Sequence, residues 1–129
     1  MSPSNTGRPA GGMGTDPHPW VKEFPGTLTV CDKNGIVIDM TDRAAKAFAE
    51  GGNPDLVGAP VYDCHPEAAK IKLKALMDGR RPNVYTFTKN GRKKLVFQAP
   101  WFIDGEYAGY LDLTLELPAD MPHFDRDAK

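Results

Sequence analysis

Hydrophobic and polar positions follow two periods along the chain, and these predict five strands and two helices. The predicted strands cover residues 27–32, 36–40, 83–88, 94–103 and 107–117. Asn34-Gly35, Asn90-Gly91 and Asp104-Gly105 lie between consecutive strands and predict tight hairpin turns. In the last strand, leucines alternate with polar residues, which predicts a leucine-lined core face and a wetter face. The leucines are Leu111, Leu113, Leu115 and Leu117, and the polar residues are Asp112, Thr114 and Glu116.

The two predicted helices lie between the second and third strands. Thr41 suits the cap of the first helix, which places Ala44, Ala47 and Phe48 on one face. Pro66 suits the start of the second helix, which ends near Gly79. Its predicted buried stripe is Ala69, Leu73, Leu76 and Met77. This order predicts an α+β domain with a five-stranded antiparallel sheet and helices packed on one face.

Composition narrows the class of protein. The chain has 129 residues, a formal net charge of -1 and two cysteines, which predict one domain, no disulfide framework and no nucleic-acid partner. Neither a signal peptide nor a membrane-spanning apolar run is visible, so we expect a cytoplasmic protein without membrane attachment. Residues 1–19 are predicted to be a flexible tail, 20–118 the domain, and 119–129 a C-terminal tail.

Three stretches carry a resemblance to a known family: TLTVCDKNGIVIDMTDRAAKAF, LVGAPVYDCHPE and DGEYAGYLDLTLEL. Together they resemble PAS domains over roughly residues 20–118, and in particular small stand-alone bacterial PAS proteins. The resemblance implies a PAS fold and a role in signal transduction. It also implies a sensor that binds a small molecule in its core and signals through protein–protein interaction. The partner would be a second copy, forming a homodimer, or another signalling protein.

A ligand in a PAS core lies between the sheet and the helices, and such sites combine apolar walls with a few polar groups. The residues expected around it are Tyr62, Cys64, His65, Tyr85, Phe87, Phe97, Gln98 and Trp101. An alternative is a ligand-free module that dimerises through the other face of the sheet and an N-terminal flank. Its expected contact residues are Trp20, Val21, Phe24, Val96 and Phe102.

The chemistry-bearing residues leave the cofactor unassigned. Haem-binding PAS proteins use a histidine near the long helix, but His65 is explained as well by a cap before Pro66. Cys64 lacks the neighbours found beside the reactive cysteine of flavin-binding light sensors, although it remains a candidate for a redox sensor. The spacing of His and Cys residues predicts no metal site. No nucleophile with a base, phosphate loop or carboxylate pair is present, so no enzyme is predicted.

Overall fold

The computed structural model describes residues 18–50, 56–61 and 67–127. A short 3-10 helix, η2 (Pro19–Val21), precedes the strands β1 (Thr27–Asp32) and β2 (Val37–Met40). The helices α1 (Asp42–Glu50) and α2 (Glu67–Gly79) follow. The chain then forms β3 (Asn83–Lys89), β4 (Arg92–Ile103) and β5 (Glu106–Glu116). The five strands and the two α-helices were predicted from the sequence, with boundaries that differ by at most two residues, whereas η2 was not predicted.

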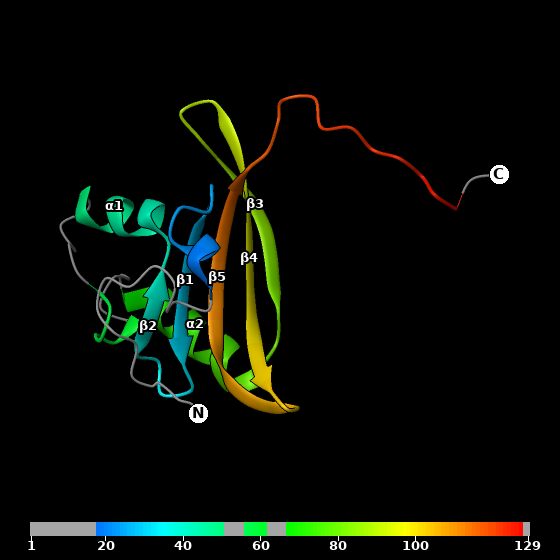
Figure 1. Cartoon of the computed structure of the whole chain (residues 1–129). Coiled ribbons are helices and arrows are strands. Elements are labelled where there is room, and N and C mark those ends of the chain that lie inside the picture. Colours follow the sequence, from blue (N-terminus) through cyan, green and yellow to red (C-terminus); the bar gives the residue numbers. More distant parts are fainter. Residues whose placement is uncertain (1–17, 51–55, 62–66, 128–129) are drawn as a thin grey trace.

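The strands form one antiparallel sheet in the order β2-β1-β5-β4-β3 (Figure 1). Figure 1 shows both helices toward the β1–β2 side, while the β3–β4 hairpin extends beyond them. In the predicted turn at Asn34-Gly35 only Gly35 has positive φ, at 81°, whereas in the next turn Asn90 and Gly91 both have positive φ, at 54° and 74°. Asp104 and Gly105 repeat this pattern, which two-residue hairpins require. The α+β prediction is therefore confirmed.

The hydrophobic core lies between the helices and the β2-β1-β5 part of the sheet. Its buried members are Cys31, Val37, Met40, Ala44, Leu56, Val61, Leu73, Met77 and Tyr110. The helical stripes agree with the sequence at Ala44, Leu73 and Met77. Phe48 packs against the core as predicted, but Ala47 is exposed and Ala45 packs against the core in its place. The buried face of α1 is therefore rotated slightly from the predicted one.

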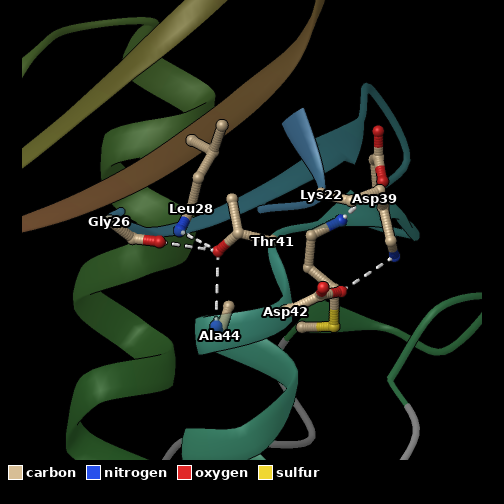
Figure 2. A network of polar contacts seen from close by, with 8 residues as sticks. Lys22, Gly26, Leu28, Asp39, Thr41, Asp42 and Ala44 are labelled. Atoms are coloured by element: carbon tan, nitrogen blue, oxygen red, sulfur yellow. Dashed lines mark hydrogen bonds and ion pairs between the residues drawn. The ribbon is translucent and has the colours of Figure 1, made fainter. Parts of the chain in front are cut away.

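Thr41 connects the start of α1 to the start of β1 (Figure 2). Its side chain is fully buried, and its Oγ1 accepts hydrogen bonds from the backbone N–H of Ala44 at 3.3 Å and of Leu28 at 3.1 Å. The same hydroxyl donates to the carbonyl of Gly26 at 2.8 Å. The predicted cap of α1 is thus present, and it also satisfies two backbone groups at the start of β1. Nearby, the ammonium of Lys22 lies 3.8 Å from the carboxylate of Asp42.

The leucines of β5 occupy the opposite face from the predicted one. Tyr110 belongs to the helix-covered core, and Asp112 and Thr114 face the same side because side chains alternate along a strand. Leu113 and Leu115 therefore point away from the helices. The alternation was predicted correctly, but the assignment of the leucines to the core was wrong. The cause is a β-bulge between Trp101 and Phe102, which shifts the pairing of β4 with β5 by one residue.

Candidate functional site

A row of polar side chains crosses the helix-covered face of the sheet. Thr29, Asp112, Gln98 and Asn83 stand directly opposite one another on β1, β5, β4 and β3. The side-chain amide of Gln98 donates to the carboxylate of Asp112 at 2.8 Å. The side-chain amide of Asn83 donates to the side-chain oxygen Oε1 of Gln98 at 2.9 Å. Thr29 and Gln98 are both buried. We call this row the floor. Burying polar groups costs free energy unless hydrogen bonds replace those to water, so a polar floor is unusual beneath the helices of a small domain.

The larger of two neighbouring cavities lies on this floor and is called the sheet–helix cavity. It has a volume of about 200 Å³. Its roof and walls are apolar and come from Phe48, Val61, Leu73 and Met77. The sheet contributes the other lining residues, most of them polar: Thr27, Thr29, Cys31, Tyr110, Leu111, Asp112 and Thr114. Apolar walls with a few converging polar groups are the usual composition of a small-molecule site.

The second cavity, called the Tyr85 pocket, has a volume of about 150 Å³. It adjoins the first cavity, because Leu73 and Asp112 line both. Gln98, Asn83 and Tyr85 form its sheet side, and α2 forms the other side. The ammonium of Lys72 lies 5.8 Å from the centre of the Tyr85 ring, which is within the range of a cation–π contact. Since 44% of Tyr85 is exposed, this pocket lies at the rim of the site.

Asp112 acts on tyrosines that line both cavities. Burial raises the pKa of Tyr85 above its ordinary value, and the charge of Asp112 raises it further. The pKa of Tyr110 is raised by burial, by Tyr107 and by Asp112. The hydroxyl of Tyr110 donates to the carbonyl of Arg81 at 2.7 Å, which ties β5 to the segment after α2. Among the described lining residues of the two cavities, Lys72 is the one cationic side chain, and it is exposed.

The residues predicted to surround a ligand divide into three groups. Tyr85 and Gln98 line the Tyr85 pocket. Phe87 shares the face of Tyr85 but lines neither cavity. Tyr62, Cys64 and His65 lie outside the described residues.

Phe97 and Trp101 were also expected in the cavity, but the structure places both elsewhere. Phe97 pairs with Leu113 and points to the uncovered face, where 40% of it is exposed. Trp101 lies over Gly109 and donates its indole N–H to the carbonyl of Cys31 at 3.0 Å. The bare β-carbon position of Gly109 provides the room, since an added carbon would lie 2.6 Å from that indole nitrogen. Trp101 therefore joins β4 to β1 across β5.

The uncovered side of the sheet, called the outer face, is apolar. By strand register it carries Leu28, Val30, Val84, Leu95, Phe97, Leu113 and Leu115. Phe24 lies beside it, because a β-carbon at Gly26 would lie 2.6 Å from the Phe24 ring and 3.0 Å from a Leu115 methyl. Trp20 is 64% exposed and Val21 is half-buried in the same N-terminal flank.

Two of the predicted contact residues lie off this surface. Val96 was expected at the interface but is 3% exposed, and it pairs with Thr114 on the helix-covered side, so that prediction was wrong. Val96 lies two residues before Gln98 on β4, so side-chain alternation places it on the same helix-covered face as Gln98. Phe102 is exposed, but its ring packs edge-on against Tyr107 at the end of the β4–β5 hairpin.

Comparisons with known proteins identify the fold. No protein-family model and no curated protein matches the chain. Among solved structures, a C-terminal domain from Streptococcus mutans is 25% identical, with a TM-score of 0.59 over 72% of this chain and 76% of that chain. The PAS domain of histidine kinase ThkA is 17% identical, with a TM-score of 0.53 over 69% of this chain and 97% of that chain. The chain has the PAS fold.

Other PAS domains among these neighbours belong to receptors and sensor kinases. The Aer2 receptor from Vibrio cholerae, described as a dual PAS–haem oxygen sensor, is 16% identical, with a TM-score of 0.53 over 72% of this chain and 95% of that chain. The PAS domain of BvgS from Bordetella pertussis is 17% identical, with a TM-score of 0.54 over 74% and 79%. At these identities, the likeness concerns the fold alone.

Two further findings concern only the part of the chain that the structure describes. No three His, Cys, Asp or Glu side chains in the described ranges gather closely enough to hold a metal ion. Within the same ranges, no helix has the length and apolar character needed to cross a membrane.

Most of the cavity floor was not predicted from the sequence. Asp112 and Thr114 were assigned to a wetter face, and Thr27 and Thr29 were assigned to no face. The four residues form two opposed pairs beneath the helices. A signal for them was available, because β1 and β5 both alternate threonine or aspartate with a large apolar residue. Two neighbouring strands with the same alternation must expose one polar and one apolar face together. Which face the helices cover was the part that the pattern left open.

Proposed function

We propose that this PAS domain is a cytoplasmic sensor that binds a small molecule in the sheet–helix cavity and signals through protein–protein contacts. The observation that carries this proposal is the polar row of Thr29, Asp112, Gln98 and Asn83 on the helix-covered face. A domain that needed only a stable core would gain more by burying the outer-face leucines there. Buried polar groups retained beneath apolar walls are typical of a binding site. The chain is proposed to bind rather than to catalyse.

The lining residues favour a particular class of ligand. The carboxylate of Asp112 and the threonine hydroxyls offer hydrogen-bond acceptors, whereas the cation Lys72 stands at the exposed rim. An anionic ligand would meet the charge of Asp112 in a partly desolvated site, which is unfavourable. A cavity of about 200 Å³ also limits the ligand to a small molecule. The expected ligand is therefore a small neutral or cationic compound with an apolar body and an N–H or O–H donor.

A signal requires that the ligand bind one conformation of the domain better than another. The elements that a ligand would touch are the sheet floor, α1 through Phe48, and α2 through Leu73 and Met77. The Tyr110–Arg81 hydrogen bond couples the floor to the end of α2. The proposed output is therefore a shift of the helices against the sheet, which changes contact with a second copy or a partner signalling protein.

Native mass spectrometry of the freshly purified chain, compared with its denatured mass, tests ligand binding directly. Gln98→Leu and Asp112→Asn alter the floor, and Thr86→Ala on the exposed face of β3 is the matched control. The proposal expects extra mass on the wild-type chain and the control, and its loss from the floor variants. Thermal shifts with small amines and alcohols should exceed those with carboxylic acids of similar size. A wild-type chain without extra mass and without any such thermal shift would contradict the proposal.

A second candidate function has its own support. The apolar outer face favours a ligand-free interaction module that associates through this surface and the N-terminal flank. The two candidates differ in their response to variants. Leu113→Ser on the outer face would weaken association in both cases, whereas Gln98→Leu would change signalling only if the cavity holds a ligand.

A further inference from the structure

The chain after β5 forms an arm that leaves the domain. Residues 118–127, called the C-terminal arm, contain no helix or strand and run away from the sheet (Figure 1). Met121 and Phe124 are 60% and 76% exposed, so the arm presents two large apolar side chains to solvent. Such side chains on an extended segment gain free energy when a partner surface covers them.

The outer face of the sheet is the matching surface. Val84 and Phe97 are 53% and 40% exposed there, beside the half-buried Leu95, Leu113 and Leu115. In Figure 1 the arm extends beyond its own sheet instead of folding back over it. The outer face and the arm therefore each leave apolar area exposed within one chain. In a dimer, the arm of each chain can cover the outer face of the other chain, which is a self-complementary interface.

We propose that the C-terminal arm of one chain lies across the outer face of a second copy, in a reciprocal dimer. This inference rests on the proposed use of the outer face for self-association and names the segment that covers it. The arm can span roughly 30 Å when extended. A five-stranded sheet is roughly 20–24 Å wide at a strand spacing of about 4.8 Å. The arm is therefore long enough to cross the partner's sheet.

Two features indicate that the arm docks on the outer face of the partner's sheet and not along an edge strand. β3 is an edge strand that offers free backbone groups, but Pro118 and Pro122 lack the N–H that strand addition needs. The arm is also acidic, since Asp120, Asp125 and Asp127 outnumber Arg126. Lys93 stands on the outer face at the β3–β4 hairpin, and it has no ion pair within the described part of the chain. The neighbouring Arg92 and Lys94 already pair with Glu116.

Sedimentation velocity over a concentration series tests the arm. The variant Met121→Ser/Phe124→Ser removes both apolar side chains from an exposed segment, so the fold is unaffected. The control Ile71→Ser removes an equally exposed apolar side chain from α2. The proposal expects a wild-type dimer, a dissociation constant at least about tenfold higher for the arm variant, and no change for the control. A dimer that the arm variant leaves unchanged overturns the arm contact but leaves outer-face association standing. A wild-type monomer at every concentration overturns both.

Cross-linking identifies the surface that the arm contacts. With p-benzoylphenylalanine in place of Phe124, isotope-labelled and unlabelled chains are mixed before irradiation. The expected products join the arm of one isotope to outer-face peptides of the other, from β4 or β5. Cross-links confined to one isotope mean that the arm covers its own domain and overturn the proposal. Links to α1 or α2 peptides of the other chain overturn it as well.

Discussion

Thr41 is predicted to be the polar side chain on which stability depends most. Thr41→Val keeps the volume and branching of the side chain but removes its hydroxyl. The change leaves the Ala44 and Leu28 N–H groups and the Gly26 carbonyl without their partner. Because Thr41 is fully buried, water has little access to replace these bonds.

The expected cost follows from the distances. The bonds of Leu28 and Gly26 to Oγ1, at 3.1 and 2.8 Å, are well formed, and losing each should cost about 1–2 kcal/mol. The contact with Ala44 is longer, at 3.3 Å, and a lost helix cap adds about 0.5–1 kcal/mol. Together these give about 2.5–5 kcal/mol, which is a large part of the roughly 5–15 kcal/mol that stabilises a typical domain. Thr41→Ser keeps the hydroxyl and loses one methyl group, for about 1 kcal/mol.

Urea unfolding followed by far-ultraviolet circular dichroism gives the free energies of unfolding of these variants. Lys22→Ala is the control for the same region. It removes an ion pair in which both side chains are more than half exposed, so we expect a loss below about 0.5 kcal/mol. A Thr41→Val variant that is as stable as Thr41→Ser would show that the hydroxyl contributes nothing, and the reasoning would fail.

Two further predictions concern β5. Gly109→Ala should cost about 2 kcal/mol or more in urea unfolding, because the added carbon meets the backbone carbonyl of Cys31 and the Trp101 indole, and a loss below about 0.5 kcal/mol would contradict this. The raised pKa values of Tyr110, Tyr85 and Cys31 mean that the folded chain holds these protons longer than the unfolded chain. Stability should therefore be complete below the ordinary values and fall as pH rises above about 9–10, less steeply in Tyr110→Phe; parallel pH profiles would argue against this.

The sequence predicted the elements well because the signals for them are local. The Asn-Gly and Asp-Gly pairs fix where hairpins turn, since only such residues adopt positive φ readily. Thr41 was predicted as a cap from its position before an apolar stripe. Its additional bonds to Leu28 and Gly26 were beyond prediction, because they join positions 13 and 15 residues apart in the sequence. Long-range contacts of this kind depend on how β1 approaches the helix, and no local pattern specifies that.

The candidate site was predicted only in part, and the β-bulge explains why. Counting back from the Asp104-Gly105 turn without a bulge pairs Gln98 with Leu111. That register places the leucines of β5 beneath the helices, as the alternation suggested. The bulge between Trp101 and Phe102 adds one residue, so Gln98 pairs with Asp112 instead.

The bulge therefore determines both proposed functional surfaces. One inserted residue moves all the following side chains of a strand from one face of the sheet to the other. Here it brings Asp112 and Thr114 beneath the helices and sends Leu113 and Leu115 to the outer face. The extra residue is Ala108 of β5, because Trp101 pairs with Gly109 and Phe102 pairs with Tyr107. The polar cavity and the apolar outer face are thus two consequences of the same shift, so a change that removed the bulge should abolish ligand retention and self-association together.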